Sequence, residues 1–560
     1  MRRTSLSRRV FLARAGALST YPFLQAGLLG SAAGAASLVH LRSAHANDGL
    51  TLVNPRLAHP VFAEPGGTFA VEVATDRRLD ASGWTVQLRT DQGAAWACRL
   101  VGTETEGIDY GRQTGYRLIV QLPASITPEL LTLEVRHRDV DGSLREERAV
   151  SVVPSLWSDC YLLQLTDEHV MYDSATHYAN DDPRSGYRSA DLVRWATPVV
   201  NLINPRLVIN SGDEVHQYAT TGWRYTYSSD LHRCYLNAKR GYRVPSLMIL
   251  GNHEIDEQRA DRRAEDWAHW ERIAGRRCFH IRMGSLKLFA HDYFDPQSRS
   301  FVDQLYRESF RDDRVEGRIF VQHHLSMYGI RPSAEYAPTA MLIGHIHNHQ
   351  IVDRWPYPIL MGGAAHKYAR GGLLRLARHD GRWTTDAGET WMASAVSLVG
   401  DYGVPRVAAR YAQPNDGRAR ANTVTITNKL AQRFGDGRVR LVLAEGRYSV
   451  RGGDILSRYP LADGKTAVLV RVDIPAQDTL TLEVVAQTSS SAVPGGVPDE
   501  RAALDTLPGE AVPLDATGAT LWETAAPPDS SDGALAPPDP GATVDPPDTQ
   551  RYQVALPMVQ

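Results

Sequence analysis

Apolar and polar positions divide the chain into stretches of different periodicity. Between residues 47 and 153, short runs alternate apolar and polar side chains, as at 69–73, 84–88 and 131–135. Turn residues separate these runs. Alternation with a period of two is typical of strands that bury one face. Residues 47–153 are therefore predicted to form an N-terminal β-sandwich of immunoglobulin or fibronectin type.

Residues 154–400 have a different pattern, in which short apolar runs alternate with longer stretches of helical appearance. The runs lie at 160–165, 206–210, 246–250, 286–290, 318–321, 340–343 and 358–361. Charged and tryptophan-rich residues at 259–274 are typical of a surface helix. Alternation of strands with helices predicts a layered α/β domain.

Residues 401–488 return to strand-like alternation, for example at 423–427 and 467–472. We predict a second, C-terminal β-sandwich there. From residue 489 to 560 the chain is rich in Pro, Asp, Ala and Gly, with repeated Pro-Pro-Asp. Such a segment buries too little apolar surface to offset the entropy of ordering it, so it is predicted to be a disordered tail.

The first 46 residues are typical of an export leader. They contain six arginines and no acidic residue. The segment Ser7-Arg8-Arg9-Val10-Phe11-Leu12 resembles the twin-arginine motif, and Ala44-His45-Ala46 fits a cleavage site between small residues. A membrane anchor is the alternative, but polar residues and proline interrupt the apolar stretch. We predict a twin-arginine signal peptide at 1–46, recognised by the twin-arginine translocase. The mature protein, without a membrane span, would be periplasmic, on the cell surface or extracellular.

The charge distribution and the cysteine content argue against a nucleic-acid binder and against a zinc knuckle. The chain has 61 basic and 64 acidic residues, and the segment 491–560 alone has eleven acids and two arginines. Once this tail and the six arginines of the leader are set aside, the folded body is near neutral. It lacks the basic surface typical of a nucleic-acid binder, so no specific nucleic-acid partner is expected. Four cysteines without CxxC spacing do not indicate a zinc knuckle. Either Cys234 pairs with Cys278, or all four, including Cys98 and Cys160, are buried thiols.

Five short polar motifs each follow one of the apolar runs of residues 154–400. They are Asp167-Glu168-His169, Gly212-Asp213, Gly251-Asn252-His253-Glu254, His323-His324 and Gly344-His345-Ile346-His347. The carboxyl ends of strands in an open α/β sheet are where ligands gather. Imidazole, carboxylate and amide donors suit Fe, Mn, Zn or Co. One aspartate can bridge two ions about 3.5–4 Å apart, so the motifs predict a centre for two divalent or trivalent metal ions.

The ordered set DxH, GD, GNHE, His and GHxH resembles the calcineurin-like metallophosphoesterase superfamily, over about 240 residues. The resemblance implies a core β-sandwich with helices on its outside, flanked here by the two further sandwiches. It also implies the ligands of two metal ions. The first ion would be held by Asp167, His169, Asp213 and His347, and the second by Asp213, Asn252, His323 and His345.

The resemblance also implies catalytic roles. His253 would contact a phosphoryl oxygen and protonate the leaving group, and Asp213 would bridge the ions. His323 fits the family pattern better than His324, although a swap between them stays open. Glu254 is expected to orient His253.

The leading hypothesis is an exported dinuclear phosphoesterase that hydrolyses phosphate mono- or diesters of a small substrate by metal-activated hydroxide attack. One alternative is a nucleotide phosphodiesterase or nuclease of the same superfamily. The other is a non-catalytic surface-binding protein built on this core.

Overall fold

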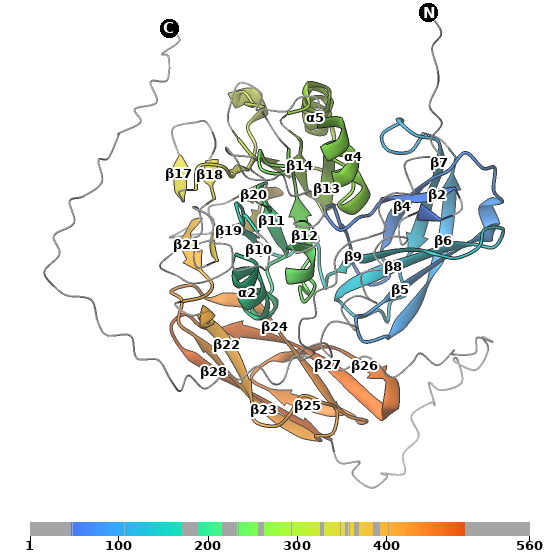
Figure 1. Cartoon of the computed structure of the whole chain (residues 1–560). Coiled ribbons are helices and arrows are strands. Elements are labelled where there is room, and N and C mark those ends of the chain that lie inside the picture. The colour runs from blue at the N-terminus through green and yellow to red at the C-terminus, as the bar shows by residue number, and fades with distance from the viewer. Residues whose placement is uncertain are drawn as a thin grey trace, which may run out of the picture. The chain divides into compact units, whose positions relative to one another are not determined.

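The computed structural model describes residues 46–487, apart from 48, 106, 171–188, 216–231, 233–234, 256–262, 293, 325–329, 348, 353–356, 358, 363–368, 385–391 and 401–402. All described residues belong to one compact unit, Met1–Gly495. Strands greatly exceed helices and assemble into five sheets (Figure 1). The described part of the chain is thus sheet-rich, with few helices.

The N-terminal sheet has nine strands in the order β1-β2-β4-β7-β6-β5-β8-β9-β3. Their bounds are β1 Ala46–Asn47, β2 Leu50–Asn54, β3 Val61–Ala63, β4 Thr68–Ala74, β5 Trp84–Arg89, β6 Ala95–Glu104, β7 Gly115–Gln121, β8 Leu130–His137 and β9 Leu144–Val152. Alternate residues point inward, so Val71 and Leu118 share a core with Leu88 and Leu133. The inward residues of this sheet therefore pack against one another and form a core of their own.

Two mixed six-stranded sheets follow. The first has the order β12-β11-β10-β19-β20, with β21 beside β19, and the second has the order β13-β14-β15-β16-β18-β17. Their bounds are β10 Cys160–Gln164, β11 Leu207–Asn210, β12 Ser246–Met248, β13 Phe279–Met283, β14 Leu286–Ala290, β15 Gly317–Gln322, β16 Ala340–Ile343, β17 Gln350–Val352, β18 Ile359–Met361, β19 Arg370–His379, β20 Arg382–Thr384 and β21 Met392–Ser397.

Parallel pairing places several strand ends at the same edge. Strands β10, β11 and β12 are parallel to one another, as are β14, β15, β16 and β18. The two sheets share one apolar core, in which Leu162 and Ile209 of the first sheet meet Val321 and Leu342 of the second. Because these inward residues are fully buried, the sheets are held face to face.

Helices cover the outer faces of these sheets. Helix α2 (Ser189–Ile203) packs Val199 in one cluster with Leu163 of β10. Helix α4 (Arg263–Ile273) packs Trp270 with Met248 of β12. Helix α5 (Pro296–Glu308) begins at Asp295, whose side chain accepts from the Gln297 amide, and it packs on β14 and β15.

The C-terminal strands form two small sheets, β22-β23-β28-β25 and β24-β27-β26. Their bounds are β22 Val407–Tyr411, β23 Ala421–Asn428, β24 Phe434–Ala444, β25 Tyr448–Arg451, β26 Asp454–Leu461, β27 Lys465–Ile474 and β28 Thr479–Ala486. Their inward residues, such as Val424 and Leu441, belong to the same apolar cluster as helix α2.

Two further expectations concern thiols and membranes. Cys98, Cys160 and Cys278 are free thiols, and Cys234 lies outside the described residues. Within the described ranges, none of the helices combines the length and the apolar character that a membrane crossing requires. The five-part division of the chain and the export leader stay predictions.

A buried ionic cluster joins the N-terminal sheet to the C-terminal sheets. The Arg440 guanidinium lies 3.1 Å from Glu129 and 2.7 Å from Asp91, and it donates to the Tyr459 hydroxyl at 2.8 Å. Tyr459 in turn donates to Glu129 at 2.6 Å. Because Arg440 and Glu129 are both buried, each depends on the other for compensation of its charge.

The variant Arg440→Met is therefore expected to lower the free energy of unfolding by about 3–5 kcal/mol, because Glu129 would stay buried without its cation. Urea denaturation measures the change. Arg471→Gln is the matched control, since Arg471 pairs with Asp454 on an exposed part of the same C-terminal sheet. Equal midpoints for the two variants would contradict the expectation.

Candidate metal centre

All five motifs lie at the carboxyl ends of parallel strands. Asp167, Gly212 and Gly251 follow β10, β11 and β12, and His323 and Gly344 follow β15 and β16. Backbone hydrogen bonds join neighbouring motifs. The Asp167 amide donates to Gly212 O at 3.1 Å, and the Gly344 amide donates to His323 O at 3.0 Å. The facing edges of the two sheets thus bring the motifs together.

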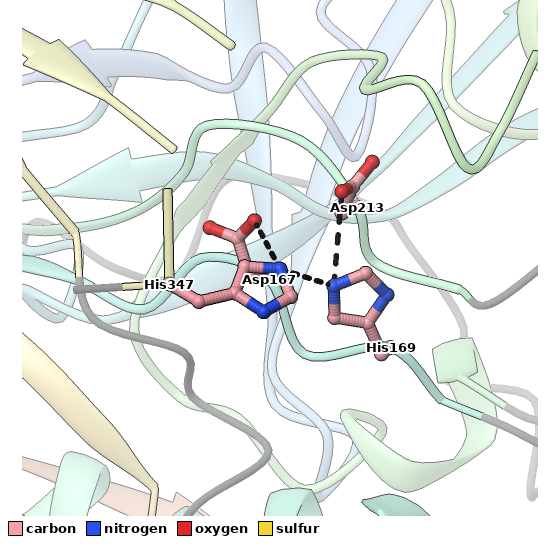
Figure 2. Close-up of side chains that lie close together, drawn as sticks. All are labelled: Asp167, His169, Asp213 and His347. Carbon is pink, nitrogen blue, oxygen red and sulfur yellow. Dashed lines mark hydrogen bonds and ion pairs between the residues drawn. The ribbon is translucent and has the colours of Figure 1, made fainter. Parts of the chain in front are cut away.

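Four side chains from three motifs form the first group of candidate ligands. Donor atoms of Asp167, His169, Asp213 and His347 all lie within 4.8 Å of one another. Figure 2 shows the two imidazoles and the two carboxylates directed at one another. The Nε2 atoms of His169 and His347 are 2.9 Å apart, and His347 Nε2 is 3.3 Å from Asp167 Oδ1. This set offers nitrogen and oxygen donors to one small volume.

The second group contains Asp213 again, with His323 and His345. Asn252 belongs to it as well, since its Oδ1 lies 2.9 Å from His323 Nε2 and 2.8 Å from His345 Nδ1. His323 Nε2 is 3.3 Å from Asp213 Oδ2. All seven residues predicted as ligands therefore lie in two groups that share Asp213.

The atoms around His323 indicate that positive charge is favourable in this volume. Its Nδ1–H donates to Ser211 O at 2.8 Å, so Nε2 of a neutral ring is an acceptor. That atom faces two further acceptors, Asn252 Oδ1 and Asp213 Oδ2. Three acceptors directed at one another repel unless a proton or a metal ion lies among them. The residues present thus fit a metal cation.

The ionisation of the site follows the same logic. Burial lowers the pKa of His323, but the Asp213 carboxylate outweighs it and raises the pKa to about 9. Burial and the nearby His323 and His324 lower the pKa of His345 to about 4. Burial also raises the pKa of Asp213, against the effect of His323. A proton on His323 and a metal ion in this volume would therefore compete for the same acceptor atoms.

The backbone of the motifs is strained. Five of the seven candidate ligands have positive φ: Asp167 at 55°, His169 at 45°, Asp213 at 58°, His345 at 72° and His347 at 56°. The left-handed region costs an L-residue about 1–2 kcal/mol. Strain of this kind persists only where surrounding contacts determine the conformation, and it gathers at functional sites.

Glu254 supplies part of that support. Its Oε2 accepts from the amides of Asp213 at 3.0 Å and Gly251 at 2.6 Å, and its Oε1 accepts from the Val215 amide at 2.9 Å. These bonds tie two ligand loops together, a role additional to the expected orientation of His253. Sequence reasoning missed this role because a backbone acceptor has no sequence signature.

The two remaining histidines of the motifs lie beside the groups. The His253 amide donates to Asp213 Oδ1 at 2.9 Å, and its ring is 4.4 Å from that of His169, edge to face. His324 does not belong to either group of candidate ligands, but its ring lies 4.2 Å from that of His345. The structure therefore places His323, rather than His324, among the candidate ligands.

No protein-family model and no curated protein matches the chain. A conserved uncharacterised protein from Streptococcus pneumoniae TIGR4, a predicted phosphoesterase, is 12% identical over 40% of this chain and 85% of its own, with a TM-score of 0.19. Wild-type Vps29 from Entamoeba histolytica, complexed with zinc, is 11% identical over 40% of this chain and 96% of its own, with a TM-score of 0.17. Likenesses at these TM-scores carry no argument about fold or activity. The described residues themselves define a sheet-rich protein with a candidate metal site lined by aspartate and histidine.

Gly251 is expected to tolerate no side chain. A Cβ at this position would lie 2.2 Å from Asp213 Oδ1 and 2.4 Å from the Asp213 amide. Gly251→Ala should therefore displace Asp213 and destabilise the protein by about 1–3 kcal/mol, as overpacking does. Urea denaturation in the presence of a chelator measures this effect apart from metal binding. Gly435→Ala is the control, because a Cβ there meets nothing within 4 Å. A midpoint equal to that of the control would be inconsistent with the crowding at Gly251.

Proposed function

We propose that this chain is an exported phosphoesterase of the calcineurin-like type, with two metal ions bound between the sheets of residues 154–400. In this proposal the N-terminal and C-terminal sheets are flanking sandwich domains. The observation that carries the proposal is that two groups of candidate ligands share the Asp213 carboxylate. A shared carboxylate is the arrangement that two-metal hydrolases use.

The residues of the two groups have distinct tasks. Asp167, His169 and His347 would hold the first ion, Asn252, His323 and His345 the second, and Asp213 would contact both. Two such ions, when bound, supply hydroxide near neutral pH and neutralise charge on the phosphoryl group. The substrate is therefore a phosphate ester attacked directly at phosphorus, and no phosphorylated serine or cysteine is needed.

His253 is the proposed general acid. Its Nε2 lies 3.9 Å from Asp213 Oδ2, and its side chain is 10% exposed, so it adjoins both the shared carboxylate and solvent. A histidine at the edge of the centre can contact a phosphoryl oxygen and protonate the departing alkoxide. General-acid catalysis of this kind contributes about 10²–10⁴-fold to a rate.

Metal content and turnover test the proposal together. The mature protein is expected to bind close to two ions and to hydrolyse p-nitrophenyl phosphate or its bis ester. His253→Ala should keep its metal but lose about 10²–10⁴-fold in kcat, whereas Asp213→Asn should lose metal as well. Elemental analysis and a chromogenic assay measure the two effects.

Asp303→Asn is the matched control, because this aspartate forms an exposed ion pair with Arg307 on helix α5. It should retain both metal and turnover. A metal-loaded wild-type protein that hydrolyses neither ester would refute the phosphoesterase.

The ratio of the two ester activities separates the enzymatic alternatives. Preference for the bis ester would favour a nucleotide phosphodiesterase or nuclease over a phosphomonoesterase. A protein that binds no metal but retains a glycan would instead favour the non-catalytic surface-binding protein.

Export by the twin-arginine route is part of the proposal and rests on the leader sequence alone. Arg8→Lys together with Arg9→Lys is expected to keep the precursor inside the cell, because the translocase recognises the arginine pair. Cell fractionation in a bacterial host with this pathway measures the exported share. Arg14→Lys, outside the pair, is the control. Undiminished export of the double variant would exclude this route.

A further inference from the structure

Glutamates that alternate with the candidate ligands form a second, buried polar layer behind the centre. Glu168 lies between Asp167 and His169, Glu214 follows Asp213, and all three carboxylates of the layer, including Glu254, are at most 3% exposed. Glu254 is held by three backbone amides, as described above. Glu168 has a different partner, a buried lysine from outside the motifs.

Lys239 is the cation of this layer. Its side chain is 2% exposed, and its Nζ lies 3.1 Å from Glu168 Oε2. Nζ also donates to the Tyr235 hydroxyl, which in turn donates to Glu168 Oε2 at 2.7 Å. The rings of Tyr235 and Tyr242 lie 4.7 Å and 5.3 Å from Nζ. A buried lysine destabilises the fold unless a neighbouring group compensates its charge. Lys239 therefore depends on its ion pair with Glu168.

A set of hydrogen bonds leads from Lys239 to the backbone of Gly212, the residue before Asp213. Glu168 Oε2 accepts from Asn210 Nδ2 at 2.8 Å, and Asn210 Oδ1 accepts from the Gly212 amide at 2.9 Å. Gly212 directly precedes Asp213. On the other side, Glu168 stands between two candidate ligands of the first ion, both of which have positive φ.

This network contacts two loops whose residues have positive φ, the loops after β10 and β11. The His169 amide donates to Asp213 O at 2.9 Å, and the Val170 amide donates to Glu214 O at 2.9 Å. The two strained loops therefore run side by side, and Glu168 is fixed between them by Lys239, Tyr235 and Asn210. A displacement of Glu168 would therefore be expected to displace Asp167, His169 and Asp213.

We propose that Lys239 is a positioning residue for the first metal ion: through its ion pair with Glu168 it holds Asp167, His169 and Asp213 in the geometry that binds the ion. This inference rests on the proposed metal centre, but not on the identity of the substrate. Partners behind the ligands of a metal site typically change metal affinity by about 10–100-fold.

Cobalt binding to the full mature protein tests the inference. In Lys239→Met we expect the first Co²⁺ to bind about 10–100-fold more weakly, with a change in its visible absorption spectrum. The second ion, which shares only Asp213 with the displaced loops, should lose less affinity than the first. Glu168→Gln, which removes the other charge of the pair, should have a similar effect. The double variant should recover most of the lost affinity, because the introduced amide retains an acceptor for Asn210 without a buried charge.

Lys287→Met is the matched control. This lysine lies on β14 and pairs with Asp312 at 3.6 Å, away from the motifs. If Lys239→Met fails to fold, the double variant with Glu168→Gln tests the inference instead. An affinity for the first Co²⁺ near the wild-type value in that variant would support the role of the Lys239–Glu168 pair.

The inference would be overturned if a folded Lys239→Met protein bound both Co²⁺ ions as tightly as the wild type. It would also be overturned if the double variant bound the first Co²⁺ as weakly as the single variants. A wild-type protein that binds two Co²⁺ ions but hydrolyses no ester would refute the phosphoesterase and leave the positioning role standing.

Discussion

Asp213 lies where the two groups of candidate ligands meet, and its carboxylate is the contact on which the centre depends. It is almost fully buried, and it faces imidazole nitrogens on both sides. A buried carboxylate is unfavourable unless positive charge is near. Asp213 Oδ1 accepts from the His253 amide at 2.9 Å, and Asp213 Oδ2 lies 3.3 Å from His323 Nε2. A cation beside Asp213 would therefore offset the cost of burying its carboxylate.

The same constraint explains the polar layer behind the ligands. Short loops after β10 and β11 must turn sharply to direct their side chains into one volume, and they do so with left-handed residues. Such turns are stable only when neighbouring groups hold them. Glu254 does this through backbone amides and Glu168 through Lys239, so two carboxylates that face away from the centre stabilise those that face it.

Much of the fold could be read locally. The runs at 286–290 and 340–343 coincide with β14 and β16, and the helix expected at 259–274 contains α4. The candidate ligands were predicted on the same basis, because each follows a strand that its own apolar residues mark. Lys239 was missed, since it lies in a segment without a motif and its partner Glu168 is distant in sequence.

The sequence by itself determined where strands end and which donor atoms stand at those ends, because apolar periodicity and residue chemistry are local properties. The sharing of Asp213 and the choice of His323 over His324 were predicted from the family resemblance, and the structure groups these residues in the same way. Tertiary structure alone decided that Lys239 pairs with Glu168 and that Glu254 joins the loops after β11 and β12. These outcomes depend on the order of strands within each sheet and on how the two sheets face each other. Non-local packing sets both, and no single segment encodes it.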